Sequence, residues 1–182
     1  MADARLGEKG EERRKIRVAI AGIGNCASAL LQGIEYYRES APRADDAWGL
    51  MHLEMGGYLP GDVEVVAAFD VDRRKVGRPL HEAAFAAPNC TTVIRESVAP
   101  SPVVVQMAPV LDGVAHHMAD YPAEQSFRVA EENPVAIEGV LEESGAEILV
   151  CYVPVGSEKA ARAYADACLA TGVSFLNCVP VF

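Results

Sequence analysis

The chain has 182 residues, of which 51% are hydrophobic and 23% are charged. This composition is typical of a globular protein, and the length suits one domain whose core needs no disulfides. The net charge of −10 argues against a nucleic-acid partner, which would favour a basic patch. No apolar run reaches the ~20 residues of a membrane helix. We therefore expect a folded protein with neither a nucleic acid nor a membrane as its partner.

The first residues and the cysteines indicate a cytoplasmic protein. Residues 1–15 are polar and of mixed charge, which predicts a solvated tail without the apolar core of a signal peptide. The five cysteines are widely spaced and form no Cys-x-x-Cys pair. That pattern is typical of reduced thiols rather than of a disulfide framework or a zinc site. The adjacent His116 and His117 point in different directions on a helix and cannot hold one metal ion together, so we expect no metal site.

Short apolar runs rich in β-branched residues alternate with segments of helical periodicity. The runs predict strands over 16–21, 63–69, 103–107, 148–153 and 173–176, with a weaker strand near 91–94. Helices are predicted from Asn25, which can cap the first one, and over 111–119, 134–144 and 158–171. Asn133 and Ser157 are the expected caps of the last two helices, and Gly172 is the expected stop signal. This alternation predicts an α/β fold, a Rossmann-like doubly wound parallel sheet with helices on both faces.

One segment, residues 38–62, breaks the pattern after the first predicted helix. It is rich in glycine and proline, yet it carries Trp48, Met51, Met55 and Tyr58. These large apolar side chains are too many for a free loop. We therefore predict an insertion that packs on the rest of one domain covering residues 16–182.

A glycine-rich turn joins the first strand to the first helix. Gly22, Gly24 and Ala27 form a Gly-x-Gly-x-x-Ala pattern. In dinucleotide-binding proteins the first glycine permits a tight turn, the second lets the backbone approach a pyrophosphate, and the small third residue lets helix and strand pack closely. The free N–H groups of the helix N-terminus favour the phosphates. The alternative is a glycine turn that binds nothing.

Asp70 ends the second predicted strand, where an acid accepts hydrogen bonds from the adenosine ribose of NAD and repels the 2′-phosphate of NADP. It follows Gly22 by 48 residues, whereas the usual spacing is about 20, and the 38–62 segment accounts for the excess. The sequence therefore favours NAD as the cofactor. Two alternatives stay open: Asp70 is a turn residue, or Arg73 and Arg74 hold a 2′-phosphate.

A second loop, residues 154–157, follows the fourth predicted strand at the edge of the sheet where ligands bind. Ser157 is either a helix cap or a cofactor contact, and the cap is the simpler interpretation. Lys159 is either an exposed lysine or a contact of a substrate phosphate. The chain has no Gly-x-Ser-x-Gly nucleophile motif.

The segment GIGNCAS at 22–28, followed by LQGIEYY at 31–37, resembles the myo-inositol-1-phosphate synthases, also called inositol-3-phosphate synthases, of the actinobacterial and archaeal type. Further segments similar to that family lie at 49–52, 67–72, 75–77, 111–113, 154–157 and 180–182. The resemblance runs from about Ile16 to the last residue, and it corresponds to the N-terminal half of the family only.

The resemblance implies an activity. The family converts D-glucose 6-phosphate to 1D-myo-inositol 3-phosphate by internal oxidation with tightly held NAD, aldol cyclisation and reduction of the ring ketone. No net redox change results, so the class is isomerase or intramolecular lyase, in inositol and phospholipid biosynthesis. The implied assembly is a homotetramer. The catalytic lysines and the tetramer contacts are expected in a C-terminal half absent from this chain. The catalytic residues here are therefore unknown, and the isolated chain is expected to be inactive.

The cofactor contacts implied by the family cover both the glycine loop and later positions. They are Gly22, Gly24, Asn25, Cys26, Ala27, Ser28, Asp70, Ser144 and Tyr164, beside Ser157 from the second loop. Ser144 stands where relatives have Ala, and it precedes its strand, at the wrong end of the sheet for a ligand. Pro79 likewise stands where relatives have Asp.

Two other functions remain open on the sequence alone. One is a non-catalytic dinucleotide-binding remnant that regulates or pairs with a longer partner. The other is an ordinary NAD-dependent dehydrogenase domain. Net turnover of NAD would distinguish the dehydrogenase from a synthase, and cyclisation by the isolated chain would distinguish a synthase from the remnant.

Overall fold

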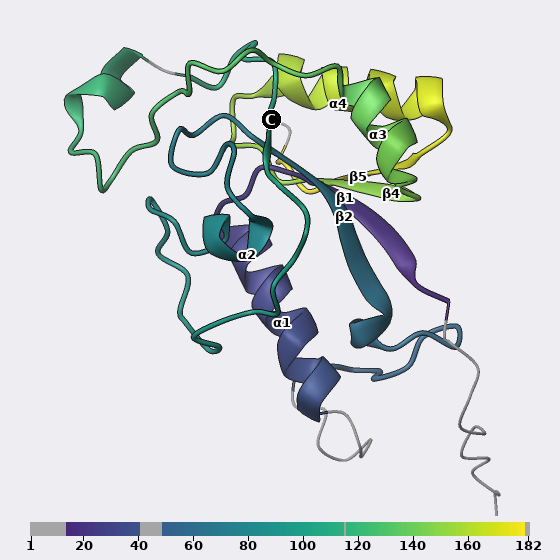
Figure 1. Cartoon of the computed structure of the whole chain (residues 1–182). Coiled ribbons are helices and arrows are strands. Elements are labelled where there is room, and N and C mark those ends of the chain that lie inside the picture. The colour runs from purple at the N-terminus through teal and green to yellow at the C-terminus, as the bar shows by residue number, and fades with distance from the viewer. Residues whose placement is uncertain (1–13, 41–48, 115, 181–182) are drawn as a thin grey trace, which may run out of the picture.

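The computed structural model describes residues 14–40, 49–114 and 116–180 (Figure 1). Five strands form one sheet in the order β3-β2-β1-β4-β5, and every neighbouring pair is parallel. The strands are β1 (Ile16–Ala21), β2 (Val63–Asp70), β3 (Gln106–Met107), β4 (Ile148–Cys151) and β5 (Ser174–Asn177). This arrangement confirms the predicted Rossmann-like sheet, with the strand order reversing between β1 and β4.

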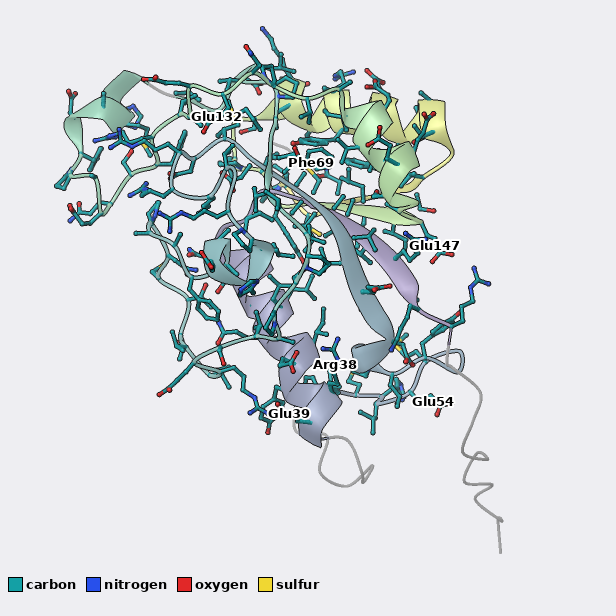
Figure 2. All side chains as sticks on the ribbon, in the orientation of Figure 1. Arg38, Glu39, Glu54, Phe69, Glu132 and Glu147 are labelled. Carbon is teal, nitrogen blue, oxygen red and sulfur yellow. The ribbon has the colours of Figure 1, made fainter. Side chains whose placement is uncertain are left out.

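Helices cover both faces of the sheet (Figure 1). They are α1 (Asn25–Ser40), α2 (Leu80–Ala83), α3 (Ile137–Ser144) and α4 (Glu158–Thr171), with the 3₁₀ turns η2 (Pro60–Asp62) and η3 (His116–Asp120). Side chains alternate along β1, so that Val18 and Ile20 pack toward α1 and α2. Ala19 and Ala21 face the opposite way, toward α3 and α4. In Figure 2, Phe69 of β2 lies in the layer beneath α3 and α4.

Strand β1 and helix α4 match the sequence prediction closely. α4 has the predicted bounds, and Gly172 ends it in the left-handed conformation at φ 74°. β1 also has the predicted bounds. These segments carry strong periodicity and clear stop signals, so the local pattern alone determines them.

Other elements differ from the prediction, each for a physical reason. β3 holds two residues instead of five, because Val103 and Val105 bond to the 77–80 backbone instead of to β2. The 91–94 strand does not form, because the Ile94 N–H donates to the Gln32 side chain. Helix 111–119 does not form: the chain bends at Asp112, and η3 follows at His116–Asp120. α3 begins at Ile137 with no side-chain cap, so the expected start at Asn133 and Pro134 is wrong.

The 38–62 segment packs less than predicted. Its first residues continue α1, and its last residues form η2, which contacts α1. Met51 and Met55 are exposed, at 95% and 69%, so the expectation that they pack on the domain is wrong. Trp48 lies outside the described residues. Within the described ranges, none of the helices is both long enough and apolar enough to cross a membrane.

Candidate functional site

Gly22 sits where three strands come together at the carboxyl edge of the sheet. Its N–H donates to the Phe69 carbonyl at 2.8 Å, and its φ is 90°. A Cβ at this position would lie 2.9 Å from the backbone carbonyl carbon and oxygen of Tyr152. Only glycine therefore fits between the ends of β1, β2 and β4.

Gly24 is glycine for a different reason. A Cβ at this position would meet no atom within 4 Å, and the residue lines a cavity. Just beyond it, Ala27 is fully buried in the α1 face of the core. The buried Ser28 accepts a bond from the Gln32 side chain, and the neighbouring Cys26 is exposed. The loop thus presents bare backbone to open space, held in place by the helix behind it.

Asp70 ties the end of β2 to the glycine loop. Its Oδ2 accepts a bond from the Ile23 N–H at 2.7 Å, and its Oδ1 accepts bonds from the N–H groups of Val71 and Asp72 at 2.7 and 2.8 Å. A carboxylate offers about four acceptor positions. One is therefore left on Oδ2 for a ligand hydroxyl. Asp70 closes its own turn and also faces the cavity.

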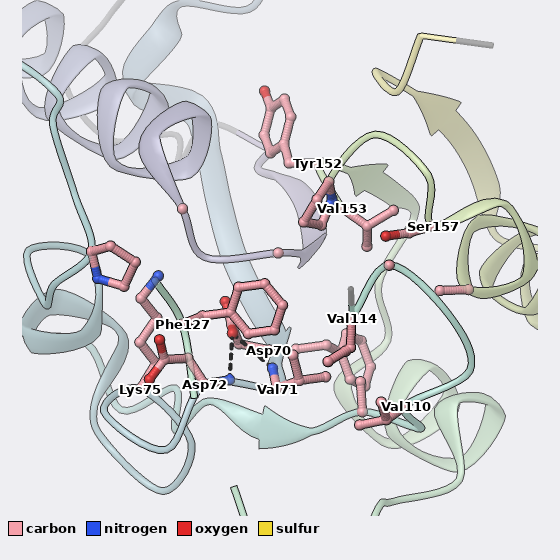
Figure 3. A pocket seen from close by; sticks show the side chains of 18 of the residues that line it. Asp70, Val71, Asp72, Lys75, Val110, Val114, Phe127, Tyr152, Val153 and Ser157 are labelled. Atoms are coloured by element: carbon pink, nitrogen blue, oxygen red, sulfur yellow. Dashed lines mark hydrogen bonds between the residues drawn. The ribbon is translucent and has the colours of Figure 1, made fainter. Parts of the chain in front are cut away.

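The cavity has a volume of about 500 Å³ and lies where the strand order reverses (Figure 3). It brings together six of the predicted site residues, which are Gly22, Gly24, Asn25, Asp70, Ser157 and Tyr164. Cys26, Ala27 and Ser28 follow on α1 but do not line it. Open parallel sheets bind their ligands at this position.

Asn25 does not have the predicted side-chain role. It is the first residue of α1, and its side chain bonds to Cys90 through both atoms: Oδ1 accepts from the Cys90 N–H at 3.0 Å, and Nδ2 donates to Sγ at 3.1 Å. The Asn25 carbonyl also accepts from the Thr91 hydroxyl. The Asn25 side chain therefore holds the loop around Cys90 at the rim of the cavity instead of capping the helix.

Asp112 caps α4, a role that the sequence analysis did not identify. Ser157 occupies the N-cap position as predicted, but its side chain makes no capping bond. The Asp112 carboxylate instead accepts from the N–H groups of Lys159 and Ala160, at 2.7 and 3.1 Å. Gly113 lies so close that a Cβ there would be 2.0 Å from the Ser157 Oγ. No local signal could reveal this cap, because it lies 47 residues away in the sequence.

Tyr164 reaches the cavity from α4. It is buried, and its ring packs on Phe69 with centroids 5.6 Å apart. Burial, and secondarily the nearby Asp70, raises the pKa of its phenol well above the usual value. The hydroxyl is therefore protonated at neutral pH and can donate a hydrogen bond.

Ser144 does not join this group. It ends α3, where its hydroxyl donates to the Leu141 carbonyl and its own carbonyl accepts from the Arg17 guanidinium. It lines a separate hollow with the first residues of β2, at the opposite end of the sheet. Nothing in this geometry directs Ser144 toward the cavity.

The basic residues after β2 have three different environments. Arg73 is exposed. Arg74 is fully engaged with the buried Asp72 and with the Ala123 and Ser126 carbonyls. Lys75 is buried and lines the cavity, which the sequence analysis did not anticipate. In the part of the chain that the structure describes, no cluster of three His, Cys, Asp or Glu side chains could hold a metal ion.

The chain is similar to curated proteins over nearly all of its length, although no protein-family model matches it. It is 46% identical over 172 residues to the inositol-3-phosphate synthase of Mycolicibacterium smegmatis, covering 94% of this chain and 46% of that protein. It is 47% identical over 167 residues to the inositol-3-phosphate synthase of Corynebacterium glutamicum, covering 92% and 44%.

Two solved structures have the same fold. The crystal structure of Ari2 has a TM-score of 0.75 at 34% identity, over 93% of this chain and 46% of that one. A myo-inositol-1-phosphate synthase-related protein from Thermotoga maritima has a TM-score of 0.63 at 17% identity, over 93% and 49%. The second likeness concerns the fold alone. The chain is therefore a homologue of the inositol-3-phosphate synthases, and it spans about half the length of the curated relatives it matches.

Proposed function

We propose that this chain is the NAD-binding part of an inositol-3-phosphate synthase, with the dinucleotide in the cavity at the carboxyl edge of the sheet. The open space in front of Gly24 carries the proposal. Gly24 stands directly before the N-terminus of α1 and lines the cavity, so bare backbone faces the cavity at this point. A pyrophosphate is an anion of suitable chemistry for bare backbone at a helix N-terminus.

The residues around the cavity fit the two halves of such a ligand. The pyrophosphate would lie against Gly24 and the first N–H groups of α1. The free acceptor position on Asp70 would take a ribose hydroxyl. Because a 2′-phosphate would meet this carboxylate, Asp70 favours NAD over NADP. Tyr164 would donate from the α4 side of the cavity.

When bound, NAD would accept and return a hydride, which supports the conversion of D-glucose 6-phosphate to 1D-myo-inositol 3-phosphate. This chain's residues would hold the cofactor and exclude water from one side of it. We propose that the phosphate-binding and proton-transfer groups for the sugar come from sequence beyond this chain, as does the surface for a homotetramer. This proposal follows from the half-length match to the relatives.

The same half-length match favours a second candidate, a dinucleotide-binding module without cyclisation activity of its own. The two differ in one assay, the release of inositol phosphate from glucose 6-phosphate with NAD and no other protein. We expect no turnover by the 182-residue chain. Turnover would mean that the catalytic groups are already present in it, whereas net consumption of NAD would indicate an ordinary dehydrogenase.

Calorimetry with NAD tests the binding proposal. We expect Gly24→Val to abolish measurable binding, because the new side chain would occupy the space of the pyrophosphate. Gly33→Val is the matched control, since Gly33 lies on α1, the helix that follows Gly24, and a Cβ there also meets no atom within 4 Å. Equal NAD affinity of wild type and Gly24→Val would remove the loop from the site.

Cofactor preference tests Asp70 separately. Asp70→Asn keeps the shape of the side chain and one oxygen acceptor, but it removes the negative charge. We expect the preference for NAD over NADP to narrow in this variant. An unchanged preference would reduce Asp70 to its role in closing the turn.

A further inference from the structure

The turn after β2 buries a lysine beside the cavity. Lys75 is only 4% exposed and lines the cavity together with Asp70 and Asp72 (Figure 3). Its backbone N–H donates to the Asp72 carbonyl at 2.8 Å, which fixes the turn. The hydrogen bonds of Lys75 to the described residues all involve its backbone, and none of these residues pairs with its Nζ.

The neighbouring carboxylates are already committed. Asp72 is bound by the Arg74 guanidinium, whose Nη2 lies 2.6 Å from Oδ2 and whose Nε lies 2.9 Å from Oδ1. Asp70 accepts three backbone N–H groups. Lys75 is therefore not the ion-pair partner of either acid, and its charge is left for the contents of the cavity.

Lysine is almost never buried to this extent unless it is paired, and Lys75 has no paired side chain among the described residues. We propose that Lys75 binds a phosphate oxygen of the ligand in this cavity, an inference that rests on the proposed dinucleotide function. An ammonium is a compact point charge suited to phosphate. The N-terminus of α1 lines the same cavity through Gly24 and Asn25, so two positive elements converge on one anion.

The phosphate has two possible sources in a dinucleotide, the bridging pyrophosphate and a 2′-phosphate. Three probes separate them in calorimetry: adenosine, ADP and 2′,5′-ADP. Lys75→Met keeps the length of the side chain but removes the charge. We expect this variant to bind ADP and NAD about tenfold more weakly or worse, because a hydrogen bond to a charged group is lost. Adenosine affinity should stay unchanged. Arg78→Met is the control and should change nothing, because Arg78 is an exposed cation near Lys75 in the sequence that does not line the cavity.

Each outcome decides the matter. A loss for ADP assigns the pyrophosphate, and a loss confined to 2′,5′-ADP assigns a 2′-phosphate; both support the proposal. Equal affinities of wild type and Lys75→Met for all probes overturn it. Lys75→Gln is the second variant if Lys75→Met fails to fold. If neither neutral variant folds, Lys75 serves the ligand-free fold and the proposal fails.

The test also separates this inference from the proposed function. If the wild-type chain binds NAD but Lys75→Met has no effect, only the inference about Lys75 fails. If the wild-type chain binds none of the probes, the proposed dinucleotide-binding function fails as well.

Discussion

Two regions of this chain are held together by different interactions. The frame, made of β1, β2, β4, β5, α1, α3 and α4, relies on strand pairing and on fully buried apolar residues such as Ile20, Phe69 and Leu149. In the crossing segment, residues 71–136, the regular elements among the described residues are α2, β3 and η3. Polar side chains bonded to the backbone hold it instead. Arg128, for example, donates to the carbonyls of Met118 and Tyr121.

The candidate site lies where the two regions meet. The frame contributes the glycine loop and the ends of the strands, while the crossing segment contributes Lys75 and Asp112. An apolar frame tolerates modest changes of shape, because hydrophobic contacts are non-directional. The crossing segment depends on directional bonds, which leave a buried charge or carbonyl without a partner when one member is removed. The two regions should therefore respond differently to substitution.

The largest expected effect is in the crossing segment. Arg74→Met would leave the Asp72 carboxylate, which is 1% exposed, without its ion pair and two carbonyls without their donor. We expect a loss of about 3 kcal/mol in the free energy of unfolding, measured with urea. Arg73→Met should stay within about 0.5 kcal/mol of wild type, because Arg73 is exposed. Equal stability of the two variants would mean that the ion pair does not hold the segment.

A smaller effect is expected at the contact between the crossing segment and the frame. Asp112→Ala removes both capping bonds to the first turn of α4. Losing a cap costs about 1 kcal/mol, and we expect that loss by urea unfolding. Ser157→Ala is the control at the formal cap position, and it should cost less because its side chain makes no capping bond. The reverse order would assign the cap to Ser157.

The sequence predicts the frame well and the crossing segment poorly, for one physical reason. β1 and α4 are specified by their own periodicity and by local stop signals such as Gly172. The residues 91–94 and 111–119 also have apolar patterns, but distant partners override them. Gln32 accepts from the Ile94 N–H across 62 residues, and Asp112 turns away to cap α4. Single-sequence periodicity holds no information on such pairings.

The residues of the candidate site also fall into two groups, those that the sequence predicts and those that it does not. The glycine loop and Asp70 could be found because a strand, a turn and a helix occur in a fixed local order. Lys75 could not be distinguished from any surface lysine, since its burial depends on how the crossing segment folds back over the cavity. Arg74 was a candidate for a 2′-phosphate, but it is committed to Asp72. The tertiary structure therefore decides which of these three adjacent cations faces the cavity without a partner.

The stability of the frame should depend on pH, because its apolar core contains buried cysteine thiols. Burial, with a smaller contribution from Cys151, raises the pKa of the Cys168 thiol to about 11. The thiol has a lower pKa in the unfolded state. The contribution of the protonated thiol to folding stability is therefore fully present below the unfolded pKa, and it is lost as the pH rises through the folded-state pKa. The urea midpoint should therefore fall between pH ~8 and ~10.5.

Cys168→Ala should reduce this alkaline slope without abolishing it. Burial also raises the pKa values of Cys151 and Tyr164, so these groups keep part of the dependence. Arg74→Met serves as a comparison from the other region and should lower stability at both pH values by the same amount. An unaltered slope in Cys168→Ala would show that titration of the Cys168 thiol does not couple to folding.

The smallest expected effect lies at Asn25, which belongs to the frame and bonds to the crossing segment through Cys90 and Thr91. Asn25→Ala removes two side-chain bonds, which are exposed and therefore worth about 0.5–1 kcal/mol together. We expect the global stability to change little, but the Cys90 amide should exchange with deuterium about fivefold faster, because its acceptor is lost. Asn177→Ala is the control, since among the described residues that side chain bonds to Val179, beyond β5. If the Cys90 amide exchanges equally fast in wild type and Asn25→Ala, the loop is held by its own Asn89 contacts. The rim of the cavity at Cys90 would then be held by the crossing segment itself, together with the bond of the Thr91 hydroxyl to the Asn25 carbonyl, which the substitution leaves in place.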